Sequence, residues 1–272
     1  MSVQDWEPLF LAVAPNGARK TQKDHPALPI TATELAATAK SCQAAGASMI
    51  HLHVRDDQGA HSLDAGRYRE AIQAIREACD DGIVVQVTTE AVGRFTPAEQ
   101  MACIRDLVPE AASFAVRELI PDAAAEAEAQ RFFFWVREAG IQAQFILYSP
   151  EDVARFEDLV ARGVLPPAPH FLLFVLGRYS EGQLSSPRDL LPFIGANSLN
   201  SPWSLCAFGP KETACAIAAA ALGGHARVGF ENNSLLPDGT VAPDNAALVS
   251  AVARGADAIG RPLGSAAQLR RL

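Results

Sequence analysis

"IHLHVRD" occupies residues 50–56 and places two histidines one residue apart at the end of an apolar run. The run begins after Gly46 and gives way to the polar segment "RDDQG", which is the pattern of a buried strand that enters a loop. Because side chains alternate across a strand, His51 and His53 project from the same side of it. Two imidazoles on one side can bind one metal ion, but two ligands alone do not complete a site.

Seven further apolar runs share this character, and segments of helical periodicity separate them along the chain. The expected strands are 9–14, 49–54, 83–88, 111–116, 143–148, 170–175, 203–208 and 225–230. The expected helices are 33–45, 66–79, 122–139, 151–162, 211–222 and 244–256. Capping residues such as Thr96 before Pro97 and Ser149 before Pro150 mark helix starts.

Eight strands that alternate with helices in a chain of 272 residues predict a (β/α)8 barrel, the TIM barrel. A doubly wound open sheet is the alternative, and it is disfavoured because no Gly-x-Gly-x-x-Gly motif follows the first strand. No composition break or low-complexity linker interrupts the sequence. We therefore expect residues 1–272 to form a single barrel domain with a short helical tail at its C-terminus.

The composition is that of a soluble globular protein, with 49% hydrophobic and 20% charged residues. A net charge of −8 and the lack of a basic tract argue against nucleic acid as a partner. No apolar run is long enough for a membrane span, and "MSVQDWEPLF" lacks the basic start and apolar centre of a signal peptide. Five scattered cysteines without a Cys-x-x-Cys motif favour reduced thiols and a cytoplasmic location.

The loops that follow the strands of a barrel share one rim, where the active sites of this fold are built. Glu231 follows the eighth expected strand, which lies next to the first strand when the barrel closes. It can therefore complete a His2Glu metal site with His51 and His53, with an open position for substrate. Other polar residues at strand ends on this rim are Arg19, Thr88, Glu90, Ser113 and Glu118.

The simpler interpretations of these residues are structural. A His-x-His pair on a strand is often hydrogen-bonded in a core, but here the shared side and the rim glutamate favour metal binding. His170 and His225 stand at strand starts, on the opposite face of the barrel, where packing is the expected role. His25 and His61 lie in expected loops and are weaker candidates. Arg227 lies in the eighth strand, where an internal ion pair with a neighbouring carboxylate is the simpler explanation.

Three motifs, "HLHVRD", "HARVGFEN" and "HPALPIT", resemble those of the β-keto acid cleavage enzymes, whose founding activity is 3-keto-5-aminohexanoate cleavage. The resemblance extends from "LFLAVAPNGA" to "AIGRPLGS", which is nearly the whole chain. It implies a metal-dependent (β/α)8 barrel that binds a divalent cation, usually zinc, through His51, His53 and Glu231. It also implies an exchange of a β-keto acid with acetyl-CoA that gives acetoacetate and a new acyl-CoA.

The resemblance further implies roles for residues around the metal. Arg227 matches a residue that neutralises charge or holds the catalytic carboxylate. Thr88 and Ser113 match hydroxyl-bearing positions that bind substrate. Members of the family are commonly homo-oligomers, and the apolar tail 258–269 is a candidate contact, unless it only closes the underside of its own barrel.

The chain departs from the family pattern at three positions. Asn232 stands where the family usually has the aspartate that acts as base, and a neutral amide cannot accept a proton as a carboxylate can. Either Glu90 or Glu118 on the same rim takes that role, or turnover is slow, or the chemistry differs. Arg19 replaces a glutamate suited to a cationic amine, and Ala115 replaces an asparagine.

Arg19 predicts that the far end of the substrate is anionic, as in 3-oxoglutarate or 3-oxoadipate, because guanidinium binds carboxylates in a bidentate fork. If Arg19 only pairs with a rim glutamate, a short neutral β-keto acid is the alternative.

Three other functions compete with the exchange reaction. An amidohydrolase-type hydrolase needs histidines after the fifth and sixth strands, where Tyr148 and Gly177 stand instead. A class II aldolase, or another metal-dependent C–C lyase, is the next enzyme alternative, and the aldolase needs a third histidine ligand. The non-enzymatic alternative is a degenerate member that binds or senses keto acids, because Asn232 removes the base.

Overall fold

The computed structural model describes residues 6–272. Residues 1–5, which begin the segment "MSVQDWEPLF" used above to argue against a signal peptide, lie outside the described residues. Within residues 6–272, no helix combines the length and the apolar character needed to cross a membrane. All five cysteines are buried, and none forms a disulfide with another.

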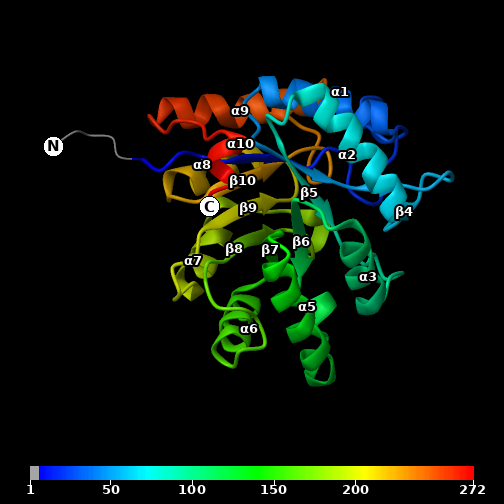
Figure 1. Cartoon of the computed structure of the whole chain (residues 1–272). Coiled ribbons are helices and arrows are strands. Elements are labelled where there is room, and N and C mark those ends of the chain that lie inside the picture. The colour runs from blue at the N-terminus through cyan, green and yellow to red at the C-terminus, as the bar shows by residue number, and fades with distance from the viewer. Residues whose placement is uncertain (1–5) are drawn as a thin grey trace.

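Eight parallel strands close into a barrel, as the sequence predicts (Figure 1). Around the barrel the order is β1, β10, β9, β8, β7, β6, β5 and β2, so each strand lies beside its neighbours in the chain and the last strand meets the first. The strands are Leu11–Val13 (β1), Met49–Leu52 (β2), Val84–Thr88 (β5), Ala111–Ala115 (β6), Gln142–Leu147 (β7), Phe171–Leu176 (β8), Trp203–Ala207 (β9) and His225–Val228 (β10). All eight expected strands are confirmed to within a few residues.

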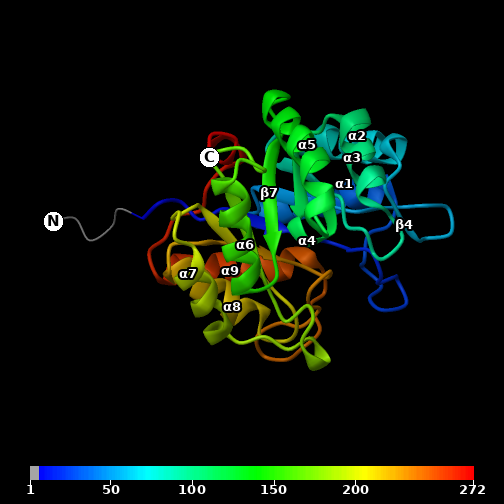
Figure 2. The ribbon, with the colours of Figure 1, turned by 90° about the horizontal axis from the view of Figure 1, so that it is seen from below.

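Helices surround the strands, as the view from below makes clear (Figure 2). The longer ones are Ala32–Ala44 (α1), Ala65–Cys79 (α2), Pro97–Leu107 (α3), Glu126–Glu138 (α5), Pro150–Ala161 (α6), Glu212–Ala221 (α8) and Asn245–Ala258 (α9). Each expected helix start with a capping residue is present. Thr96 accepts a hydrogen bond from the backbone N–H of Glu99, and Ser149 accepts one from that of Asp152.

Three local expectations differ from the structure. Residues 122–139 do not form one helix, because a 3₁₀ turn at Ala123–Ala125, capped by Asp122, precedes α5. A short antiparallel pair, β3 (Val54–Arg55) and β4 (His61–Ser62), follows β2 where a plain loop was expected. Two short helices, α4 (Val116–Leu119) and α7 (Leu191–Ala196), fill connections that carried no helix prediction.

The interior of the barrel is filled in layers, which leaves polar groups in the middle. Gln86 of β5 donates a hydrogen bond to Gln144 of β7, two strands away, so both side chains lie inside the barrel. Toward the rim lies an apolar cluster of Ala115, Ile146, Leu173, Val175, Cys206 and Phe208. Toward the opposite end lies a second cluster of Phe10, Met49, Val84, Ala111, Ala266 and Leu269. The barrel is therefore a packed core, and a cavity of about 270 Å³ lined by Gln86, Gln144 and Leu269 among others lies toward the end opposite the rim.

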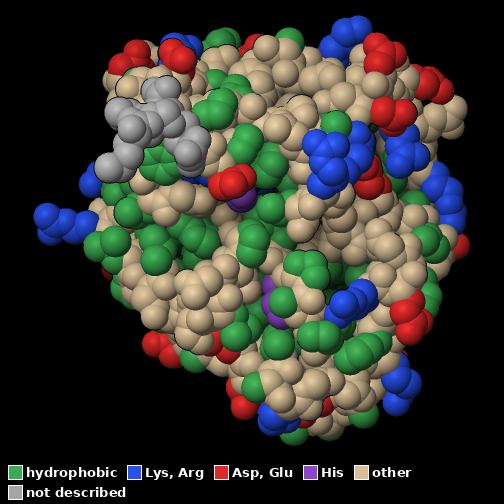
Figure 3. All heavy atoms as spheres, turned by 60° about the vertical axis from the view of Figure 1, so that its left-hand side comes forward, with side chains coloured by type: hydrophobic (Ala, Val, Ile, Leu, Met, Phe, Trp, Pro, Cys, Tyr) green, Lys and Arg blue, Asp and Glu red, His purple; other side chains and the backbone are tan. Residues whose placement is uncertain are grey.

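The tail after α9 closes the end of the barrel opposite the rim. Its short helix α10 (Ala266–Leu269) buries Ala266 and Leu269 against Phe10 and Met49. Both described chain ends lie on this side, where apolar side chains gather over the middle of the visible face (Figures 1 and 3). This packing agrees with the alternative interpretation of the tail, that it covers the underside of its own barrel. The expectation of a homo-oligomer stays a prediction.

Replacing Leu269 with Ala tests this closure. Leu269 is 2% exposed, and a buried Leu→Ala change costs about 2–5 kcal/mol of unfolding free energy because it leaves a cavity. We expect a clear loss in urea unfolding, read by circular dichroism. Leu272→Ala is the matched control, because Leu272 lies in the same tail but is exposed, and it should lose less than about 1 kcal/mol. Equal losses for the two variants would contradict the closure.

Candidate active site

The carboxyl ends of β2, β1 and β10 lie side by side at the rim. Parallel pairing places Ile50 of β2 opposite Val13 of β1, and Val13 opposite Val228 of β10. Glu231 follows β10 by three residues, and its backbone N–H donates to the carbonyl of Ala14 just beyond β1. Residues about 180 positions apart in the chain therefore meet across one strand.

Two glycines allow this approach, because both have positive φ and stand where a Cβ atom would collide. A Cβ on Gly229 would lie 2.4 Å from the carbonyl oxygen of Ala14, and Gly229 has φ of 138°. A Cβ on Gly17 would lie 2.7 Å from Cγ of Glu231. The backbones of the β1 and β10 loops can therefore close around the glutamate only with glycine at these positions.

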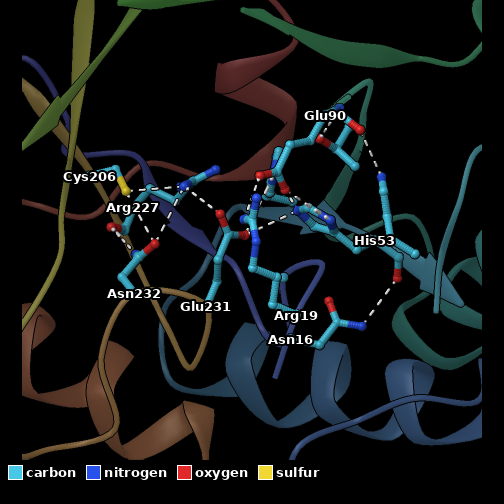
Figure 4. Close-up of polar contacts among 12 residues, drawn as sticks. Asn16, Arg19, His53, Glu90, Cys206, Arg227, Glu231 and Asn232 are labelled. Atoms are coloured by element: carbon cyan, nitrogen blue, oxygen red, sulfur yellow. Dashed lines mark hydrogen bonds and ion pairs between the residues drawn. The ribbon is translucent and has the colours of Figure 1, made fainter. Parts of the chain in front are cut away.

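Glu231 reaches the two histidines predicted to bind metal. His51 Nε2 and His53 Nε2 lie 3.2 Å apart, and Glu231 Oε2 lies 3.2 Å from His53 Nε2 and 3.9 Å from His51 Nε2. Figure 4 shows Glu231 between His53 on one side and Arg227 on the other. Zinc ligands about 2.0–2.1 Å from the ion lie roughly 3.3 Å from one another in a tetrahedral set, so these three atoms have suitable spacing.

The protonation of the cluster also suits a cation. Burial, with the positive charge of Arg227, holds the pKa of His51 well below its usual range, so its imidazole is neutral and can offer a lone pair. Burial acts to raise the pKa of Glu231, but Arg227 and His53 outweigh it and keep that pKa well below its usual range. Oε2 of Glu231 is buried and has no hydrogen-bond partner in the described chain. An unpaired carboxylate oxygen beside two imidazole nitrogens is a donor set that fits a divalent cation.

A residue that sequence reasoning missed orients the first histidine. Gln86 Oε1 lies 2.8 Å from His51 Nδ1, which assigns the ring proton to Nδ1 and leaves Nε2 facing the cluster. Gln86 in turn donates to Gln144 at 3.1 Å. The only signal in the sequence was an amide side chain within the apolar run "IVVQVT".

Arg227 is buried inside the barrel and joins Glu231 to the residue after it. Its Nη2 lies 3.0 Å from Glu231 Oε1, 3.0 Å from Cys206 Sγ and 3.4 Å from Asn232 Oδ1 (Figure 4). Asn232 is also buried, and it accepts a hydrogen bond from the Cys206 thiol at 3.2 Å. The structure therefore brings Arg227, Glu231 and Asn232 together, and the ion pair expected for Arg227 is present within the candidate site.

Glu90 lies on the other side of the histidines and links two arginines. Its Oε1 pairs with Arg19 at 3.1 Å and with Arg178 at 3.2 Å, while Oε2 lies 3.9 Å from His53 Nδ1. Burial, with the charge of Glu231, raises the pKa of Glu90, although His53 opposes this shift. The backbone carbonyl of Glu90 is hydrogen-bonded to His61 Nε2 at 2.9 Å. His61, which was expected in a loop, therefore supports Glu90 in the candidate site. Sequence reasoning missed this role because β4 was not expected.

The remaining predicted residues differ in their access to the site. Thr88 lines the cavity, and its hydroxyl accepts a hydrogen bond from the Glu90 backbone N–H. Ser113 is the register partner of Thr88 on β6, and its buried hydroxyl has no partner in the described chain. Glu118 is turned toward the backbone N–H of Ala91, at 2.9 Å, and it supports the loop after β5.

The cluster opens into a cavity with charged walls. A small space of about 20 Å³ beside His51 and His53 adjoins a larger one of about 170 Å³, and both are lined by Glu90, Arg178 and Glu231. Arg227 lines the inner space, and Arg19 and Lys20 line the outer one. Four cationic side chains and two carboxylates therefore face this cavity, whose inner wall includes Ile146, Val175 and Phe208.

A closed (β/α)8 barrel with a buried arginine and a His2Glu cluster at its rim has the architecture of a barrel enzyme with a candidate metal site. Residues 8–272 match the family model described as beta-keto acid cleavage enzyme. The chain belongs to this family, as the motifs predicted.

Known relatives agree with this assignment. The 3-keto-5-aminohexanoate cleavage enzyme of Acetoanaerobium sticklandii is 33% identical over 271 residues, which covers 98% of each chain. The 3-oxoadipate:acetyl-CoA acetyltransferase of Cupriavidus necator is 28% identical and covers 98% of this chain and 94% of that protein. The solved apo structure of ObcA superposes with a TM-score of 0.71 at 17% identity, over 90% of this chain and 65% of that one. That structural likeness concerns the fold.

Metal analysis tests the cluster. Protein purified without chelator should carry a divalent ion, and His53→Ala should lower the bound metal roughly 10-fold or more, because it removes a ligand. His170→Gln is the control, since His170 packs at the opposite end of the barrel against Phe145 and Phe156. It should keep the wild-type metal content, as measured by mass spectrometry of the metals. A wild-type protein that carries no divalent ion would contradict the predicted metal site.

Proposed function

We propose that this protein exchanges a β-keto acid with acetyl-CoA to give acetoacetate and a new acyl-CoA. In this reaction the bond between Cα and the keto carbon breaks, Cα bonds to the acetyl carbonyl carbon instead, and the thioester C–S bond of acetyl-CoA breaks to free the CoA sulfur. The original acyl group passes to the CoA sulfur, and the proton taken from Cα is returned, so no oxidant is needed. The observation that carries the proposal is the His51–His53–Glu231 cluster beside Arg227, in a chain of this family.

The proposal assigns a role to each side chain at the cluster. His51, His53 and Glu231 would hold a divalent cation, zinc in our proposal, which supplies Lewis acidity toward the keto and carboxylate oxygens of the substrate. Arg227 holds Glu231 by the 3.0 Å contact and adds positive charge where negative charge develops on oxygen. The hydroxyls of Thr88 and Ser113 are proposed substrate contacts.

Glu90 is our candidate for the base that takes a proton from Cα. Asn232 is an amide, and its nitrogen and oxygen are both engaged with neighbouring residues. Glu118 is held by the Ala91 backbone, whereas Glu90 lines the cavity beside His53. Geometry therefore favours Glu90 over Glu118, because a base must come within hydrogen-bond reach of the proton it removes.

An anionic β-keto acid is the substrate class we propose. The cationic side chains of Arg19, Lys20 and Arg178 outnumber the carboxylates in the outer cavity, and Arg19 is 57% exposed in spite of its pair with Glu90. An exposed guanidinium can exchange that pair for a substrate carboxylate at little cost. The relative from Cupriavidus necator is named for 3-oxoadipate, a dicarboxylic β-keto acid, which supports this class. The five thiols without disulfides support the proposal that the enzyme acts in the cytoplasm.

Acyl-CoA mass spectrometry tests the reaction. The purified protein is incubated with acetyl-CoA and a panel of β-keto acids that includes 3-oxoglutarate, 3-oxoadipate and short aliphatic members. We expect acetoacetate and the matching acyl-CoA to form together, with the dicarboxylic acids as the better substrates. A panel without any new acyl-CoA would overturn the proposal and favour a protein that only binds keto acids.

Arg19→Glu tests the substrate charge. Loss of a charge-assisted hydrogen bond, with a new carboxylate in its place, should lower kcat/KM for a dicarboxylic substrate about 10-fold or more. The value for a neutral β-keto acid should change far less. Lys23→Glu reverses an exposed charge in the same loop without lining the cavity, and it should leave the preference between the two substrates intact. Equal losses for both substrates with Arg19→Glu would make Arg19 structural.

A further inference from the structure

Glu212 is a fully buried carboxylate that the proposed reaction does not use. It lies in the first turn of α8, and its relative exposure is 0%. Burial raises its pKa to about 8, although hydrogen bonds from Asn232 and the Gly229 backbone oppose the shift. A buried carboxyl group destabilises a fold unless hydrogen-bond donors surround it. The residues that donate to Glu212 are therefore the ones that it can position.

Its partners all belong to the segment that follows β10. Oε1 accepts hydrogen bonds from the Gly229 backbone N–H at 3.0 Å and from Asn232 Nδ2 at 3.1 Å. Oε2 accepts one from Asn233 Nδ2 at 3.3 Å. Glu212 thus binds the residues on both sides of Glu231 without touching the metal cluster itself.

The contact with Asn232 sets the direction of the amide. A side-chain amide has one donor end and one acceptor end. Because Nδ2 faces the Glu212 carboxylate, Oδ1 must face Arg227 Nη2 and the Cys206 thiol, as it does. In the reverse orientation, Nδ2 would face the Arg227 guanidinium, which has only donors, and that contact would be repulsive.

We propose that Glu212 is a positioning residue for this site, and that it supplies, through Asn232, the carboxylate that the chain lacks at position 232. The proposal rests on the proposed function, in which Arg227 must hold Glu231. The carboxyl group of Glu212 lies one residue beyond Asn232, and the amide of Asn232 transmits its orienting effect to Arg227.

The proposal requires that positions 212 and 232 carry one carboxylate between them. Asn232→Asp in the wild type would place a second buried carboxyl group about 3 Å from Glu212 and remove the Nδ2 donor, and the two groups could not both be ionised at that distance. Glu212→Gln would leave no carboxylate in the pair. Glu212→Gln combined with Asn232→Asp restores the count, and the amide introduced at position 212 can then donate to the new carboxylate.

The experiment compares these three variants with the wild type. We expect each single variant to lower kcat about 10-fold, as loss of supporting contacts around a metal site commonly does. The double variant should recover most of that loss, so that Asn232→Asp is harmful when Glu212 is intact and beneficial in the Glu212→Gln background. The Tm of each variant, read by differential scanning fluorimetry, reports the purely structural effect.

Zinc affinity, measured by competition with a chelator, gives a readout that needs no turnover. We expect Asn232→Asp to lower zinc affinity when Glu212 is intact and to raise it in the Glu212→Gln background. If the wild type forms no acyl-CoA, the proposed reaction fails while the zinc titration still decides the role of Glu212. If Glu212→Gln lowers only the Tm and leaves kcat and zinc affinity intact, Glu212 merely supports the loop. If Asn232→Asp has the same sign of effect in both backgrounds, the proposal is overturned.

Discussion

The closure of the barrel between β1 and β10 is the constraint on which the candidate site depends. Three residues of β1 pair with β10 and two pair with β2, and this short strand joins the two segments that carry the cluster. The loops after β1 and β10 then approach so closely that Gly17 and Gly229 leave no room for a side chain. A sheet left open at this seam would separate Glu231 from His51 and His53, and neither the cluster nor its cavity would exist.

The closed seam also explains how so many ionisable groups remain buried. Arg227, Glu231 and Glu212 all lie inside the protein, and each would be costly alone. Arg227 pairs with Glu231, Asn232 bridges Arg227 to Glu212, and the Gly229 backbone satisfies the last carboxylate. Such a network has a single compatible arrangement of donors and acceptors, so it fixes the direction in which Glu231 presents its free oxygen. The contacts of Asn232 with Arg227 and Glu212 therefore orient the groups around the cluster.

Much of this was predictable from the sequence. The eight strands were found because their apolar runs end in turn signals, and the cluster was found because strand ends in a barrel share one rim. The residues that were missed have no local signature. Gln86 and Glu212 look like ordinary polar residues in a strand and at a helix start, and His61 and Arg178 look like loop residues. Each matters only through a partner about 20 to 90 residues away, such as His51 for Gln86 and Glu90 for Arg178.

The sequence by itself therefore determined the barrel, the family and the identity of His51, His53 and Glu231 as candidate ligands. Strand patterns and short motifs are visible within a few residues of the chain, and strands that follow one another in a barrel end at the same rim. The tertiary structure decided how these groups are supported. It paired Arg19 with Glu90 rather than leaving it unpaired, turned Glu118 toward the Ala91 backbone, and placed Glu212 behind Asn232. Hydrogen-bond partners across a barrel depend on side-chain directions and distances of a few ångströms, which appear only when all eight strands are in register.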